Sequence, residues 1–103
     1  MKAFETEESA LSNERFRINF TEHDFIGGIP SGTYNALMAR LMGLTYPDFL
    51  RYARDNFGAT LAGITGYSYL LFDNKANCER LVKELNRRWD LMIKKRKSLG
   101  LEV

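Results

Sequence analysis

The last third of the chain carries an apolar stripe with helical spacing, and this stripe constrains the fold more than any other feature. Its members recur at steps of three and four residues: Cys78, Leu81, Val82, Leu85, Trp89 and Met92. Such steps place side chains on one face of an α-helix. The sequence therefore predicts a helix from Asp73 or Asn74 to about Lys97. Because one face of this helix is apolar, a second layer of structure must cover it.

Two other segments have the patterns of β-strands. In residues 15–20 the apolar side chains alternate with polar ones, which is typical of a half-buried strand. Residues 59–72 are rich in β-prone side chains and have two glycines in the middle, so they predict a hairpin. The expected sheet is therefore small and antiparallel.

Two shorter helices are predicted between the first strand and the hairpin. Apolar residues recur at helical steps from Gly32 to Met42, and Gly43 is expected to end this helix. The next helix is predicted from Pro47 to about Asn56, because Thr45 can cap it and proline fits a first helical turn. We expect Gly58 to end it.

These elements give an α+β fold of order β-α-α-β-β-α, in which about three strands pack against three helices. Residues 1–13 are polar and acidic without convincing periodicity, so we expect a flexible acidic N-terminal arm. Residues 14–103 then form a single compact domain. A chain of 103 residues with 45% apolar content suits one modest core.

Several classes of protein are excluded by what the sequence lacks. It has neither an apolar run of membrane-spanning length nor a signal-peptide pattern, so we expect a cytoplasmic protein without membrane contact. Its one cysteine, Cys78, lies on the apolar stripe and is expected to be buried. With His23 as the one histidine, no Cys/His zinc site is expected. No catalytic motif is present, so we expect no enzyme.

No cofactor is expected either. Gly27 and Gly32 stand five residues apart before a predicted helix, as in a nucleotide-binding P-loop. However, Thr33 occupies the position at which a P-loop requires lysine to reach the phosphates. The glycines are therefore interpreted as an ordinary loop.

The pair of short helices resembles the helix-turn-helix of DNA-binding proteins. The pattern comprises a small residue, a glycine four residues later and flanking apolar positions: Met38, Ala39, Met42, Gly43, Leu44, Phe49 and Tyr52. The resemblance covers about 20 of the 103 residues. It implies that the second helix is a recognition helix, with Arg51 and Arg54 contacting guanine edges or phosphates. Simple packing of two helices gives the same pattern, and Asp48 and Asp55 balance the two arginines.

Charge is distributed unevenly along the chain, although the net charge is only +2. Residues 1–14 carry one basic and four acidic side chains, whereas residues 75–103 carry nine basic and four acidic ones. The final predicted helix ends in four consecutive basic residues: Lys94, Lys95, Arg96 and Lys97. Such a cluster either grips the phosphates of a nucleic acid or forms a solvated helix end.

Two functional hypotheses follow. The first is a small non-enzymatic protein-interaction module, an inhibitor or adaptor of a larger protein. It would bind either through the acidic N-terminal arm or through Tyr67 and Tyr69 on one strand face, if these are exposed rather than in the core. The second is a nucleic-acid-binding regulator that uses Arg51, Arg54 and the basic cluster at 94–97. We favour the first, because a net charge of +2 is low for an unaided DNA binder. A homodimer is compatible with both hypotheses.

Overall fold

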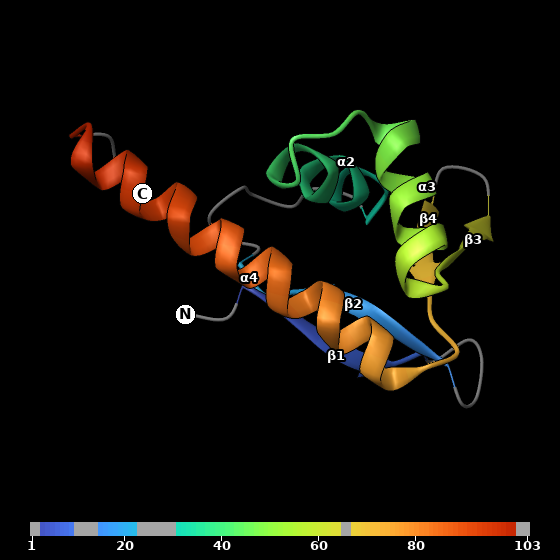
Figure 1. The fold of residues 1–103 in the computed structure, drawn as a ribbon. Helices are drawn as coiled ribbons and strands as arrows, with labels where there is room; N and C mark the ends of the chain where they lie inside the picture. Colours follow the sequence, from blue (N-terminus) through green and yellow to red (C-terminus); the bar gives the residue numbers. More distant parts are fainter. Residues whose placement is uncertain (1–2, 10–14, 23–30, 65–66, 101–103) are drawn as a thin grey trace.

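The computed structural model describes residues 3–9, 15–22, 31–64 and 67–100, and within these ranges it leaves the side chains of 31–33, 63–64 and 67–68 undescribed. Its elements follow the order β-β-α-α-β-β-α: β1 (Phe4–Glu8), β2 (Phe16–Phe20), α2 (Ser31–Leu41), α3 (Tyr46–Phe57), β3 (Thr60–Ile64), β4 (Tyr67–Leu71) and α4 (Lys75–Ser98) (Figure 1). The predicted α+β class is confirmed, with four strands in place of about three.

The strands form two antiparallel hairpins. β1 pairs with β2, with Phe4 opposite Phe20, and β3 pairs with β4. One antiparallel bridge joins the hairpins, because Phe16 and Phe72 each donate a backbone hydrogen bond to the other's carbonyl at 2.8 Å. The β1–β2 hairpin is thereby held beside the end of β4.

The prediction of a flexible arm over residues 1–13 is wrong for Phe4–Glu8, which form strand β1. The other residues of the expected arm lie outside the described part of the chain, apart from Ala3 and Ser9, which are buried. Phe4 is 1% exposed and packs against Phe20 and Trp89, with ring centroids 5.1 Å and 6.1 Å away. The buried side chain of Phe4 thus anchors to the core a strand that otherwise carries three glutamates.

The helices begin and end close to the predicted residues because local caps operate there. The Thr45 side chain accepts a hydrogen bond from the backbone N–H three residues later, and the Asn74 side chain does the same for α4. Gly43 and Gly58 follow α2 and α3 with φ angles of +71° and +67°. Only glycine adopts this left-handed conformation without steric cost.

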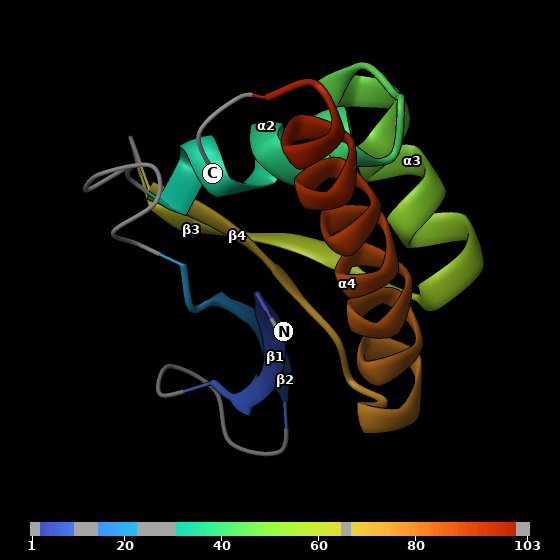
Figure 2. The ribbon, with the colours of Figure 1, turned by 90° about the vertical axis from the view of Figure 1, so that its left-hand side faces the viewer.

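Helix α4 covers one face of the β1–β2 hairpin and also contacts α2 and α3, while α2 packs on β4 (Figures 1 and 2). The predicted stripe of α4 is buried from Cys78 to Trp89, and Met92 is partly buried. Trp89 makes edge contacts with Phe4 and Phe20 at the centre of this layer. In the described part of the chain, no helix has the length and apolarity needed to cross a membrane.

Candidate functional site

The two arginines predicted to contact DNA are each paired with a neighbouring aspartate on α3. Arg51 lies 3.5 Å from Asp48, and Arg54 lies 3.0 Å from Asp55. All four side chains are exposed, so the aspartates present negative charge beside each arginine. The exposed face of α3 is therefore close to neutral, which reduces its attraction for phosphates.

The basic cluster lies at the other side of the molecule. Lys94, Lys95 and Lys97 are exposed and Arg96 is partly buried. These residues belong to the last turns of α4, which extend away from α3 (Figure 1). The structure therefore does not bring the two predicted sets of nucleic-acid-binding residues together on one surface.

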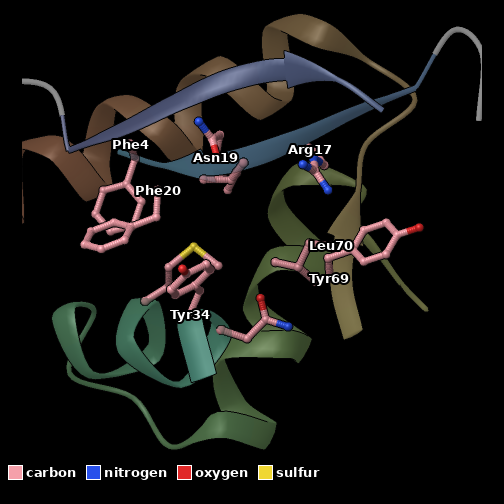
Figure 3. A pocket seen from close by; sticks show the side chains of 10 residues that line it. Phe4, Arg17, Asn19, Phe20, Tyr34, Tyr69 and Leu70 are labelled. Carbon is pink, nitrogen blue, oxygen red and sulfur yellow. The ribbon is translucent and has the colours of Figure 1, made fainter. Parts of the chain in front are cut away.

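Tyr69, predicted as an anchor for a protein partner, is in the core rather than on the surface. It is 9% exposed and lines a cavity of about 230 Å³ between β2, α2 and β4 (Figure 3). This volume is below the range of about 300–1,000 Å³ that is usual for small-molecule sites. The side chain of Tyr67 lies outside the described part of the chain.

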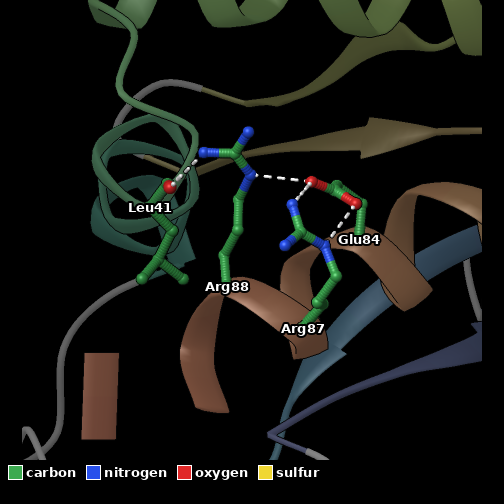
Figure 4. Close-up of polar contacts among 4 residues, drawn as sticks. All are labelled: Leu41, Glu84, Arg87 and Arg88. Carbon is green, nitrogen blue, oxygen red and sulfur yellow. Dashed lines mark hydrogen bonds and ion pairs between the residues drawn. The ribbon is translucent and has the colours of Figure 1, made fainter. Parts of the chain in front are cut away.

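Glu84, Arg87 and Arg88 form a polar cluster that joins α4 to α2 (Figure 4). Both arginines donate hydrogen bonds to the Glu84 carboxylate, and these bonds lower the pKa of Glu84 to about 2. Arg88 also donates to the carbonyl of Leu41 at 3.2 Å, at the last residue of α2. This carbonyl has no partner within its own helix, so the cluster caps α2.

Cys78 is buried as predicted. Burial raises the pKa of its thiol to about 11, although a hydrogen bond from the Thr6 hydroxyl at 3.6 Å acts in the opposite direction. A thiol with this pKa is protonated at neutral pH and is a poor nucleophile. His23 lies outside the described residues, and among those described no group of three or more acidic, histidine or cysteine side chains is arranged to hold a metal ion.

An open groove lies between β1 and α4, and the sequence did not predict it. Its volume is about 960 Å³. Three residues of β1 and seven of α4 line it: Phe4, Glu5, Thr6, Lys75, Glu79, Val82, Lys83, Asn86, Arg87 and Asp90. We call it the β1 groove.

The β1 groove runs beside the outer edge of a strand. β1 pairs only with β2 among the described strands, so its other edge is not covered by a strand. Backbone hydrogen bonds from Thr21 to Ala3 and from Ser9 to Arg15 show that the odd-numbered residues of β1 bond toward β2. The N–H and C=O groups of Phe4, Thr6 and Glu8 therefore point to the outer edge.

Asn86 of α4 fills one position along this edge. Its side-chain oxygen accepts a hydrogen bond from the Phe4 N–H at 2.8 Å, and its side-chain nitrogen donates to the Phe4 carbonyl at 2.9 Å. This pair of bonds is what a neighbouring strand would supply. No described residue supplies such bonds to the backbone of Thr6 and Glu8.

Comparison with family models, with curated proteins and with solved structures gives no match for this chain.

Proposed function

We propose that this protein is a small non-enzymatic interaction module, an inhibitor or adaptor, that binds an extended segment of a larger protein along the outer edge of β1. The observation that carries the proposal is the outward orientation of the Thr6 and Glu8 backbone groups on the edge of β1 whose Phe4–Thr6 part lines the β1 groove. An exposed strand edge is a template for another strand, and proteins commonly use one to bind extended peptides.

The arrangement supports strand addition in three ways. Thr6 and Glu8 together offer two N–H donors and two C=O acceptors to an added strand. The β1 groove supplies room for the side chains of that strand on the α4 side. Asn86 already bonds to Phe4, so it marks the end of the available edge and limits the register of the added strand.

The test is selection of a displayed random peptide library against the full chain, followed by binding measurements with the selected peptides. Glu8→Pro removes the outward N–H, and its missing donor takes no part in pairing with β2. Glu8→Ala is the matched control, because it keeps the N–H. We expect Glu8→Pro to abolish binding and Glu8→Ala to retain it, with circular dichroism confirming that both variants fold.

Amide hydrogen exchange gives an independent measurement on the same complex. The Thr6 and Glu8 amides are expected to exchange rapidly in the free protein and slowly with a bound peptide. Equal affinity of the parent chain and Glu8→Pro, with no new protection at Thr6, would show that the edge of β1 is not the binding site.

Nucleic-acid binding is the second candidate, favoured by the exposure of Lys94, Lys95 and Lys97 on the last turns of α4. This hypothesis keeps Arg96 in the nucleic-acid site. It gives Arg51 and Arg54 a minor role, because each of these two arginines is paired with an aspartate. Its test is binding to short duplex and single-stranded DNA and RNA at low and physiological salt. Binding that survives physiological salt and is lost on alanine substitution of the three lysines would support it.

A further inference from the structure

We infer that the segment bound along β1 is a basic extended peptide in which lysine or arginine alternates with uncharged residues. This inference rests on the proposed function, because it concerns the chemistry of the partner at the same edge. It follows from the two faces that β1 presents to an added strand. Successive side chains of a strand point to opposite faces, so each face selects every second residue of the partner.

The face away from α4 is acidic. Glu5 and Glu7 lie on this face, opposite Asn19 and Arg17 of β2. Arg17 forms an ion pair with Glu7, whereas the hydrogen-bond partner of Glu5 is the uncharged amide of Asn19 at 3.1 Å. Beside an antiparallel added strand, Glu5 and Glu7 occupy the non-hydrogen-bonded positions, where facing side chains approach most closely. A basic residue is favoured opposite Glu5, and Glu7 adds a second carboxylate that Arg17 shares.

The face of β1 toward α4 favours neither positive nor negative side chains in the added strand. Thr6 lies on this face, where its hydroxyl contacts Cys78. The adjoining wall of α4 carries charged side chains of both signs: Lys75, Glu79, Lys83, Arg87 and Asp90. Val82 is 8% exposed between them. Small uncharged residues such as threonine or valine fit this wall at the alternate positions.

A second copy of this chain is a poor occupant of the same edge. In an antiparallel pair of β1 strands, the outward-pointing backbone groups of even-numbered residues must face one another. A pair centred on Thr6 places Glu5 opposite Glu7 of the second copy, and a pair centred on Glu7 places Glu7 opposite itself. Both registers bring like charges together, which destabilises strand pairing.

The probe for this inference is a short fluorescent peptide in which lysine and threonine alternate, measured by fluorescence anisotropy against the full chain. The control peptides are one with glutamate in place of lysine and one of the same composition with the lysines grouped. We expect only the alternating lysine peptide to bind. The double variant E5Q/E7Q should weaken this binding by about tenfold, while D48N/D55N, a matched loss of two exposed carboxylates on α3, changes it less than about twofold.

Two modified peptides and one further variant of the protein separate this inference from the proposed function. N-methylation of the threonine amides, which face β1 in this register, should abolish binding, whereas N-methylation of the lysine amides should not. The double variant E5K/E7K should reverse the preference, so that the glutamate peptide binds and the lysine peptide does not.

The possible results have distinct meanings. If binding depends on alternate amides but not on the sign of the peptide charge, this inference is wrong and strand addition stands. The same conclusion follows if the lysine peptide does not bind while peptides from the library bind through Thr6 and Glu8. If library peptides also bind independently of Thr6 and Glu8, the proposed function itself is wrong.

Discussion

At the scale of single residues, Asn86 replaces a missing strand. Its side-chain amide satisfies both backbone groups of Phe4 across 82 positions of the sequence. Without this contact, a single polar residue beside the apolar stripe of α4 would be assigned to the solvent-exposed face of the helix. The contact depends on the position of a distant strand, so the sequence of the helix alone does not reveal it.

We therefore predict that Asn86→Ala destabilises the protein by about 1–3 kcal/mol, because it leaves the part-buried backbone groups of Phe4 without partners. Urea unfolding measures the change. Asn77→Ala is a control in the same helix, since the Asn77 side chain bonds only to exposed Arg80 in the described structure, and we expect a smaller loss. Equal losses for the two variants would contradict the role assigned to Asn86.

Cys78 supplies a second prediction at this scale, concerning stability at alkaline pH. Burial raises the pKa of the thiol from 9.0 to about 11, so the folded state holds this proton more tightly than the unfolded state does. The contribution of Cys78 to stability is therefore complete below pH 9 and declines between pH 9 and about 11. Comparing the parent chain with Cys78→Ala across this range isolates the effect from tyrosine and lysine titration. A constant difference in unfolding free energy would contradict the prediction.

At the scale of elements, the sequence predicts best those features that depend on the spacing of nearby residues. The stripe of α4 and the caps at Thr45, Gly43 and Gly58 depend only on local spacing, and the structure confirms them. The sequence pattern does not predict β1, because Glu5 and Glu7 on the face away from α4 make this five-residue strand resemble a polar arm. Its alternation of Phe4 and Thr6 with Glu5 and Glu7 was the signal available.

The importance of β1 is tested by Phe4→Ala. Because Phe4 is 1% exposed and contacts two aromatic rings, we predict a loss of about 3–5 kcal/mol of unfolding free energy. Glu5→Ala on the exposed face of the same strand should cost far less. Thermal unfolding of both variants gives the comparison. A loss for Phe4→Ala no larger than for Glu5→Ala would restore the flexible-arm interpretation.

The candidate site was harder to predict than the fold, for a physical reason. Which backbone groups of β1 point outward depends on its register with β2, and the β1 groove needs α4 in place beside it. Neither can be read from the residues of β1 themselves. The predicted anchors were chosen by residue type, and the exposure of such side chains depends on the packing of distant elements, as Tyr69 demonstrates.

At the scale of the whole molecule, the Glu84 cluster is one of the polar contacts that join the helices in the described part of the chain. Arg88 connects α4 to the end of α2, and Glu84 holds Arg88 in place. Within the described ranges, the hairpins are likewise joined by one backbone bridge, between Phe16 and Phe72. The arrangement of the layers therefore depends chiefly on the apolar core.

The Glu84 cluster predicts a stability change at acid pH. The pKa of Glu84 is lowered from 4.5 to about 2, so its contribution is present above pH 4.5 and is lost as the pH falls toward 2. Because Glu84→Gln removes this titration, we expect the parent chain to be the more stable of the two at neutral pH and the difference to vanish near pH 2. Urea unfolding at a series of pH values measures it, and a difference independent of pH would contradict the assignment.

The contacts between Phe4 and α4 also decide when the protein can fold during its synthesis. β1 and β2 are synthesised before α4, and α4 carries Trp89, which covers Phe4 and Phe20. At ordinary translation rates the interval between Phe4 and Trp89 is on the order of ten seconds. Throughout that interval the apolar face of the β1–β2 hairpin has no helix to cover it. Nascent chains of this protein are therefore expected to need protection from aggregation until α4 is complete.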